Sequence, residues 1–118
     1  MSLISSKLER ATQDHYTLAE IERTLKNREL SYSYAEQGDL DIIQLIIDSE
    51  KALELAQPTE IQRMTVDLVW RQGYNLVETG KMLGVTPQAV KFNLGLLKIK
   101  IQKVLDEWKA MDKGGEVA

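Results

Sequence analysis

Five lysines are the most prominent chemistry-bearing residues in the second half of the chain: Lys81, Lys91, Lys98, Lys100 and Lys103. No acidic residue lies between Thr79 and Leu105, so this stretch is locally basic. Ammonium groups gathered in this way can bind nucleic-acid phosphates, and the carboxamide of Gln88 among them can pair with the edge of adenine. A lysine-rich stretch is also the ordinary pattern of a solvated helix face. The secondary structure that carries these lysines must therefore show whether they can bind a nucleic acid.

Residues suited to catalysis or metal binding are sparse. The chain has no cysteine and a single histidine, His15, which falls on an apolar stripe where a packed or surface histidine is the ordinary interpretation. No phosphate-cradling glycine loop and no nucleophile with a neighbouring base can be assembled. We therefore expect that the protein is not an enzyme, and that it holds no metal and no cofactor.

Charge is distributed unevenly along the 118 residues, whose formal net charge is −3. Residues 1–57 hold six basic and eleven acidic residues, whereas residues 58–118 hold nine and seven. A basic helix on an acidic body suits directional docking on phosphates. No apolar run approaches the roughly 20 residues of a membrane span, and the N-terminus shows no signal-peptide pattern. We expect a cytoplasmic protein that makes no membrane contact.

The elements that would position the basic residues begin at Asn75. This residue can cap a helix from Leu76 to about Met82, and Glu78 at the third helical position completes a capping box. Gly84 stands where the chain must leave the helix with a positive φ. Gly80, inside the first helix, is expected to let a second helix cross closely.

A second helix is predicted to begin directly after this turn. Thr86 is its expected N-cap, and Pro87 is its expected first residue, where a missing N–H costs nothing. One stripe at helical spacing faces inward: Val90, Leu94, Leu97 and Ile101. On or beside the opposite face lie Gln88, Lys91, Phe92, Gly95 and Lys98.

From Pro58 to about Lys103 the chain resembles region 4 of bacterial sigma factors, a promoter-binding helix-turn-helix, and more loosely the activators that share it. The residues that carry the resemblance are Val66, Leu68, Val69, Gly73, Tyr74, Asn75, Glu78, Gly80, Leu83, Gly84, Val85, Thr86, Val90, Lys91 and Leu94. The departures from the family pattern are Gly80, Pro87, Phe92 and Gly95. The resemblance implies an all-α fold, with a helix-turn-helix domain of the sigma region 4 type preceded by one or two N-terminal helices.

Three parts are predicted along the chain: an N-terminal helical appendage and linker (1–38), a helical DNA-binding domain (39–111) with the helix-turn-helix at 75–103, and a flexible tail (112–118). The appendage is either one helix ending at Asn27 or two helices broken near His15 and Tyr16. Both Ser6 with Glu9 and Thr17 with Glu20 form capping boxes, so the choice stays open. Residues 28–39 are predicted to be a linker with one helical turn.

Two further helices are predicted before the helix-turn-helix. One runs from Leu40 or Asp41 to about Gln57 and is apolar over more than half of its circumference at its start, so we expect it to be buried on two sides. The next begins at Pro58 and stops at Gly73. The basic helix is expected to continue through a run of apolar residues: Ile99, Ile101, Val104, Leu105 and Trp108. Its distal part is expected to fold back on the helix from Leu40, on the N-terminal helix, or across a dimer interface.

Recognition of this kind inserts the second helix into the major groove, where its first two turns reach base edges. Gln88 would pair with adenine, and Lys91 would reach guanine or a phosphate. Phe92 would contact a thymine methyl or be buried against the helix from Pro58. Phosphates would be held by Lys98, Lys81 and the backbone N–H groups at the capped ends Thr86 and Asn75.

Three hypotheses follow. The first is a small phage or bacterial transcription regulator, which binds double-stranded DNA specifically and uses its N-terminal helices to dimerise or to contact RNA polymerase. The second is a DNA-packaging adaptor of the phage small-terminase type, which would assemble into rings. The third is an interaction protein that binds polymerase or a sigma factor without touching DNA. Because a single module buries modest area on DNA, we expect a homo-oligomer.

Overall fold

The computed structural model describes residues 16–27, 31–33 and 36–117. Within these ranges the fold is all-α and contains no strand. The elements are α2 (Leu18–Lys26), α4 (Leu40–Leu55), α5 (Glu60–Val66), the π-helical turn η1 (Asp67–Arg71), α6 (Leu76–Leu83) and α7 (Pro87–Val117). The predicted capping pair Ser6 and Glu9 lies outside the described residues, as does His15.

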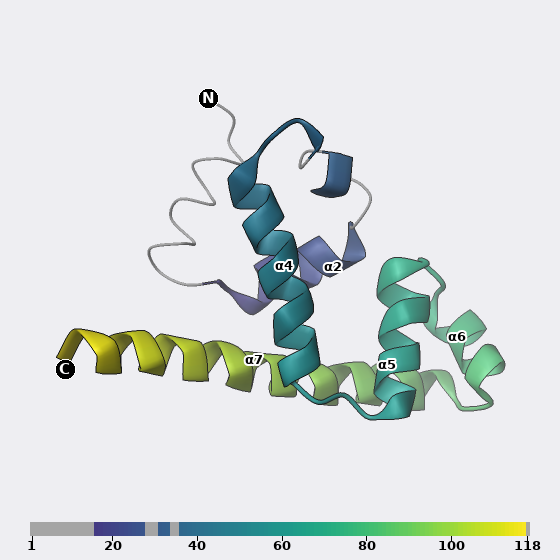
Figure 1. Ribbon diagram of the computed structural model, residues 1–118. Coiled ribbons are helices and arrows are strands. Elements are labelled where there is room, and N and C mark those ends of the chain that lie inside the picture. The colour runs from purple at the N-terminus through teal and green to yellow at the C-terminus, as the bar shows by residue number, and fades with distance from the viewer. Residues whose placement is uncertain (1–15, 28–30, 34–35, 118) are drawn as a thin grey trace.

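The long helix α7 is the base on which the other elements pack. In Figure 1, α4 stands across its middle with α2 close by, while α5 and α6 flank its N-terminal half. Helix α7 has 31 residues and continues to Val117, so the predicted boundary at Met111 is not a helix end. Gly114 and Gly115 each destabilise a helix by about 1 kcal/mol relative to Ala, and this cost does not by itself end the helix.

Side-chain caps set where the first helices begin. Thr17 and Glu20 form the predicted capping box, and because Tyr16 and Thr17 are not helical, the structure favours the break near Tyr16 over one continuous helix. Residues 31–33 are helical, in keeping with the predicted turn in the linker. At the start of α4, the carboxylate of Asp39 accepts a hydrogen bond from the backbone N–H of Ile42 at 3.2 Å.

The start of α5 corrects one predicted boundary. The prediction placed Pro58 at the head of this helix, but the helix begins at Glu60. Thr59 Oγ1 accepts a hydrogen bond from the backbone N–H of Gln62 at 3.2 Å, and Gln62 Oε1 accepts one from the Thr59 N–H at 3.0 Å. This reciprocal cap makes Thr59 the N-cap and leaves Pro58 one residue outside the helix.

The predicted connection between α6 and α7 is confirmed in its details. Asn75 Oδ1 accepts from the backbone N–H of Glu78 at 2.8 Å, and α6 ends at Gly84 with φ of 71°. Thr86 Oγ1 then accepts from the backbone N–H of Ala89 at 3.1 Å, so α7 begins at Pro87 as expected. The turn between the two helices is only three residues long.

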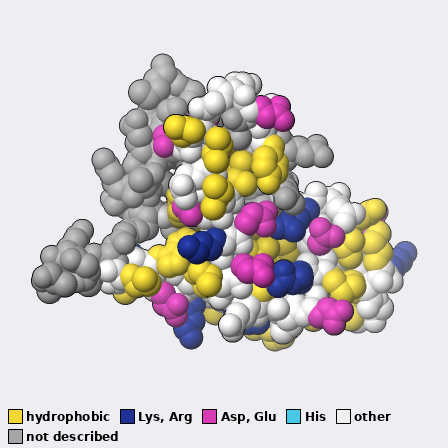
Figure 2. Space-filling view, in the orientation of Figure 1, with side chains coloured by type: hydrophobic (Ala, Val, Ile, Leu, Met, Phe, Trp, Pro, Cys, Tyr) yellow, Lys and Arg dark blue, Asp and Glu magenta, His cyan; other side chains and the backbone are white. Residues whose placement is uncertain are grey.

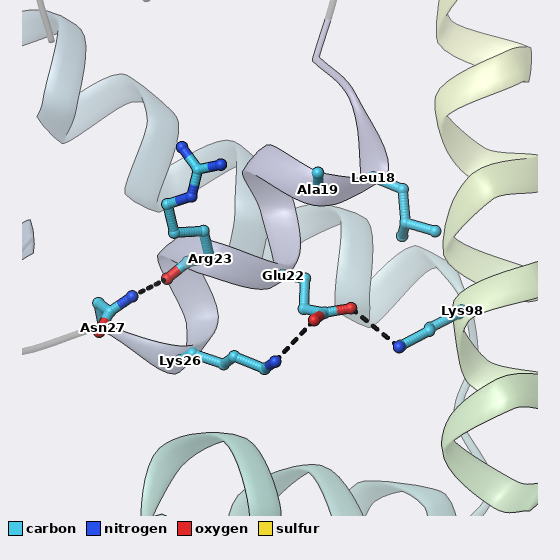
Figure 3. Close-up of a pocket in the computed structure, with 7 residues that line it drawn as sticks. All are labelled: Leu18, Ala19, Glu22, Arg23, Lys26, Asn27 and Lys98. Atoms are coloured by element: carbon cyan, nitrogen blue, oxygen red, sulfur yellow. Dashed lines mark hydrogen bonds and ion pairs between the residues drawn. The ribbon is translucent and has the colours of Figure 1, made fainter. Parts of the chain in front are cut away.

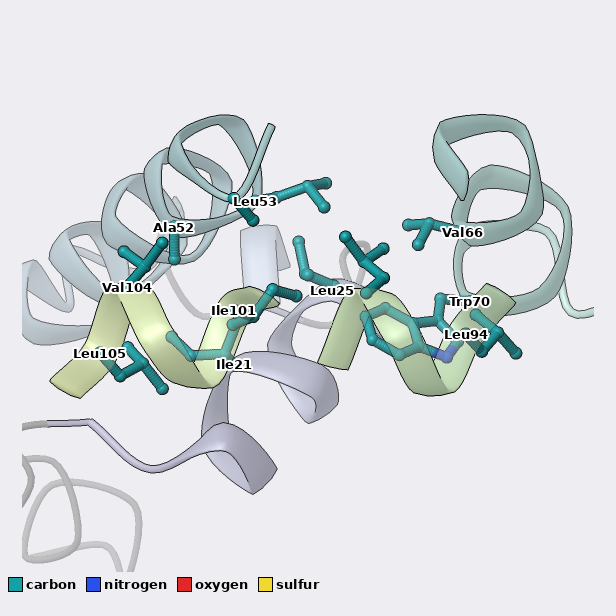
Figure 4. Close-up of a cluster of buried hydrophobic side chains, with 12 residues drawn as sticks. Ile21, Leu25, Ala52, Leu53, Val66, Trp70, Leu94, Ile101, Val104 and Leu105 are labelled. Carbon is teal, nitrogen blue, oxygen red and sulfur yellow. The ribbon is translucent and has the colours of Figure 1, made fainter. Parts of the chain in front are cut away.

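One apolar cluster joins α7 to four other elements. Trp70 of η1 is only 3% exposed and packs in this cluster. Figure 4 shows side chains of α2, α4, α5 and η1 directed at the same side of α7. The buried members are Ile21, Leu25, Ala52, Leu53, Ala56, Val66, Trp70, Leu94, Leu97, Ile101, Val104 and Leu105. The distal half of α7 therefore folds onto α2 and α4, which are two of the three predicted alternatives.

Helix α4 is less buried than its apolar pattern suggests. Its inner residues Ile42, Leu45 and Ile46 form a second, smaller cluster with Tyr16, but Leu40 is 75% exposed and Ile47 53% exposed. Helix α4 does pack against both α2 and α7, in line with the expected burial on two sides, while Leu40 and Ile47 stay exposed. No helix in the described ranges is long and apolar enough to cross a membrane.

A hydrogen bond ties the start of α2 to α4. The Tyr16 hydroxyl donates to Asp48 Oδ2 at 2.7 Å. Burial, together with this bond and the Asp48 charge, raises the pKa of Tyr16 above its ordinary value of 10.0. The hydroxyl therefore stays protonated and keeps donating throughout the neutral range.

Gly80 is required by the turn that follows α6. A Cβ at this position would lie 2.7 Å from the carbonyl oxygen of Val85, whose N–H also donates to the Gly80 carbonyl at 2.9 Å. The closest neighbour is therefore the backbone of the turn, and the second helix approaches through its first residue, since the backbone nitrogen of Pro87 would lie 3.4 Å from this Cβ.

We predict that Gly80→Ala destabilises the protein by roughly 1–3 kcal/mol, because the turn backbone must move to admit the methyl group. Gly95→Ala is the matched control, since no atom lies within 4 Å of its Cβ position, and helix propensity then favours Ala by up to about 1 kcal/mol. Urea unfolding followed by circular dichroism measures both. Equal stability of the two variants would show that the Val85 contact is unimportant.

Candidate nucleic-acid interface

The outward face of α7 carries three of the eight residues predicted to contact DNA, Gln88, Lys91 and Phe92. A shallow surface groove on this face is lined by Gln88, Lys91, Phe92, Gly95, Leu96 and Ile99. Opposite this face, Val90 and Leu97 are fully buried. The core therefore holds one side of α7 in place and leaves the other open to solvent.

Phe92 points outward, which excludes one of its two predicted roles. Its side chain is 65% exposed, so it is not buried against α5. Ile99, two turns further along the same face, is 68% exposed, although the sequence pattern placed it among the residues that fold back onto other helices. The first turns of α7 thus present an apolar strip beside a carboxamide and an ammonium group.

The side chains of Gln88, Lys91 and Lys81 are exposed. Within the described part of the chain, none of the three takes part in a hydrogen bond or ion pair. Gln88 and Lys91 lie three residues apart on α7, which places them on neighbouring positions of one face. These two groups are therefore free to bind an external partner. Lys81 belongs to α6 and is not among the residues that line the groove.

Lys98 is held by the N-terminal helix. Its Nζ lies 3.1 Å from Glu22 Oε1, while Lys26 Nζ lies 2.7 Å from Glu22 Oε2 (Figure 3). Burial alone would raise the pKa of the Glu22 carboxyl, but the two ammonium groups outweigh it and hold that pKa below 4.5. Lys98 is thus not a free cation, and its predicted phosphate contact stays a prediction that must compete with Glu22.

Lys100 is also engaged inside the molecule. Its ammonium group donates to Gln62 Oε1 at 2.8 Å and to the backbone carbonyl of Gln57 at 3.4 Å. The lysine ties α7 both to α5, through Gln62, and to the connection before it, through Gln57. The five lysines that look like one group in the sequence therefore serve different purposes.

Ion pairs also occupy the two arginines near α5. Arg71 lies 2.6 Å from Glu50, and Arg63 lies 3.6 Å from Glu54. Figure 2 shows basic and acidic side chains next to each other on this side of the molecule. Because their charges are locally balanced, these arginines add little to a phosphate-binding surface.

The capped N-termini of α6 and α7 differ in how well they can bind an anion. The backbone N–H of Asn75 already donates to Glu78 Oε1 at 3.0 Å, so this one group is engaged, and the predicted phosphate contact at the start of α6 stays a prediction. The start of α7 has no acidic residue in its first turn. Thr86 and Pro87 therefore lie at a helix end whose positive dipole is not neutralised by a carboxylate.

Sequence reasoning missed Glu22, Leu96 and Ile99 as parts of this surface or its surroundings. The spacing of Glu22 and Lys26 by four residues suggests a local ion pair, but nothing in the sequence places Glu22 beside Lys98.

Across the described ranges, no three His, Asp or Glu side chains come together as a metal site. In comparisons with known proteins, no family model, curated protein or solved structure matches the chain.

We predict that Glu22→Gln lowers the free energy of unfolding by up to about 1 kcal/mol at pH 7, because the contact between α2 and α7 loses its charge. The pKa of Glu22 is lowered by folding, so its stabilisation is present above the ordinary value of 4.5 and is lost as the pH falls through the folded-state value. The difference between wild type and variant should therefore shrink in acid.

Glu54→Gln is the control, since that carboxylate is 72% exposed and its pair is long. It should change stability less than Glu22→Gln at pH 7. Denaturant titrations between neutral pH and about pH 3 measure the effect. A Glu22→Gln difference that does not change with pH would contradict an ionic origin.

Proposed function

We propose that this protein is a sequence-specific DNA-binding transcription regulator of the sigma region 4 type. In this proposal α6, the turn and α7 form a helix-turn-helix, and the first turns of α7 enter the major groove. The observation that carries the proposal is the outward face of α7, where Gln88 and Lys91 stand exposed and free of internal partners.

The local geometry supports this function. Asn75, Gly84 and Thr86 provide the cap, turn and cap that the family pattern requires, and the start of α7 is free of acidic residues. Gln88 lies in the first turn of α7, and Lys91 begins the second. These are the positions from which a recognition helix reaches base edges, while Thr86 lies where backbone groups meet a phosphate.

The N-terminal helices supply the second part of the proposal. Helix α2 covers the distal half of α7, and α4 leaves Leu40 and Ile47 exposed on its outer face. A regulator that dimerises or contacts RNA polymerase needs a surface of this kind away from the DNA. Lys81, on α6, would add a phosphate contact at the edge of the interface.

A second candidate function is favoured by one observation. Phe92 and Ile99 are both more than 60% exposed, which is unusual for a helix that meets phosphates alone. An interaction protein that binds polymerase or a sigma factor through this strip, without DNA, would use the same face. DNA binding distinguishes the two candidates. The regulator should bind duplex DNA with an affinity that depends on salt, whereas the interaction protein should not bind it.

We predict that the intact protein binds duplex DNA with an affinity that falls steeply as salt rises. Lys91→Ala should weaken binding to all sequences and reduce the slope of log affinity against log salt by about one. Gln88→Ala should leave that slope unchanged and relax the preference for adenine at one position. Fluorescence polarisation over a salt series, with duplexes selected from a random pool, measures both effects.

Lys51→Ala is the matched control, because Lys51 is an exposed lysine on α4. It should leave DNA binding unchanged. Lys98→Ala should weaken binding less than Lys91→Ala, since Glu22 already neutralises Lys98. If the folded wild-type protein shows no salt-dependent binding to any duplex, the regulator proposal is wrong and the interaction protein takes its place.

A further inference from the structure

We infer that Phe92 reads the C5-methyl group of thymine, so that the DNA site of this protein contains a thymine close to the adenine bound by Gln88. This inference rests on the proposed function and adds the base that its exposed apolar group selects. It follows from the position of Phe92 on α7, from its surroundings, and from the chemistry of the major groove.

The surroundings of Phe92 leave its ring accessible from the side that faces away from the core. The ring is 65% exposed, and Leu96, half-buried, lies one turn further along. No atom lies within 4 Å of the Cβ position of Gly95, so the space beside the ring is open. Phe92 is thus a projecting apolar side chain in a shallow groove, which can bury one small apolar group against its ring.

The major groove offers one apolar group, the methyl at C5 of thymine. The edges of the other bases present only hydrogen-bond donors and acceptors there, and burying those against a phenyl ring would leave them unsatisfied. Phe92 lies four residues after Gln88, about 6 Å along the helix, which corresponds to roughly two base steps of 3.4 Å. A thymine within about two base pairs of the adenine would therefore meet the ring.

Charge favours DNA over a protein helix as the occupant of this groove. Lys91 lines it, and the chain has no acidic residue between Thr79 and Leu105 that could pair with a basic partner. A second apolar surface laid on Phe92 would bury the Gln88 amide and the Lys91 ammonium group beside it. Duplex DNA provides an acceptor for each of these two groups as well as the methyl.

Ile99 provides a control that separates thymine recognition by Phe92 from nonspecific apolar contact along the strip. It is as exposed as Phe92, but it lies 12 residues after Pro87, about 18 Å along the helix. The major groove is about 12 Å wide, so Ile99 lies beyond the bases when the start of α7 is inside. An equal loss of apolar surface at the two positions should therefore have unequal effects on DNA binding.

The test replaces thymine by deoxyuridine, which removes only the methyl group. A duplex selected by the wild-type protein from a random pool is compared with copies in which each thymine is substituted singly. We expect one substitution to weaken wild-type binding roughly threefold to tenfold. Phe92→Ala should bind the thymine duplex more weakly by a similar factor and lose the distinction between thymine and uracil. Ile99→Ala should keep both the affinity and the distinction.

Three other outcomes would overturn the inference. If the wild-type protein binds specifically but does not distinguish thymine from uracil at any position, Phe92 does not read the methyl, and the proposed function stands. If no duplex binds, the proposed function itself is wrong. If sedimentation shows a dimer that both Phe92→Ala and Ile99→Ala dissociate, with no effect of uracil, the strip is an interface between two copies of the chain. Circular dichroism confirms that each variant is folded.

Discussion

Burial of one side of α7 is the interaction on which the rest of the structure depends. The stripe that includes Leu94, Leu97 and Ile101 contacts residues of α2, α4, α5 and η1, so a single helix organises the larger of the two apolar clusters. The same helix carries the outward face with Gln88 and Lys91. Because both faces belong to one rigid element, the packing of the core determines how the outward face is presented.

Interactions inside the molecule reduce the number of lysines on α7 that are free to bind a partner. The sequence shows one basic stretch, but Lys98 is paired with Glu22, and Lys100 is bound to Gln62. With these two lysines engaged inside the molecule, Lys91 is the unpaired lysine that lines the outward groove of α7. A small basic region beside an apolar side chain favours contact at a defined place over uniform attraction to any polyanion.

The features that could be predicted from sequence are those set by local chemistry. Caps at Asn75 and Thr86 and the positive φ at Gly84 each depend on residues within a few positions, and helical spacing identified the buried stripe of α7. The start of α5 was misplaced because the capping pair at Thr59 competes with the familiar helix-start signal of proline. Here too the interactions are local, so a closer reading of the sequence could have found the correct boundary.

The remaining differences arise from contacts between residues far apart in the chain. No periodicity reveals that Glu22 reaches Lys98, or that the outer face of α4 stays uncovered at Ile47. The predicted DNA contacts Gln88, Lys91 and Phe92 share one face of α7, but which lysines are free depends on tertiary packing. Ile99 was misjudged for the same reason, since an apolar residue is assigned to the core by its type alone.

The continuity of α7 limits how this protein can change during evolution. Insertion of one residue between Val90 and Leu105 would rotate everything beyond it by about 100°, which would turn part of the buried stripe toward solvent. Substitutions on the outward face disturb no packing and can vary freely. Homologues should therefore keep the length of this segment constant while the residues of its outward face vary.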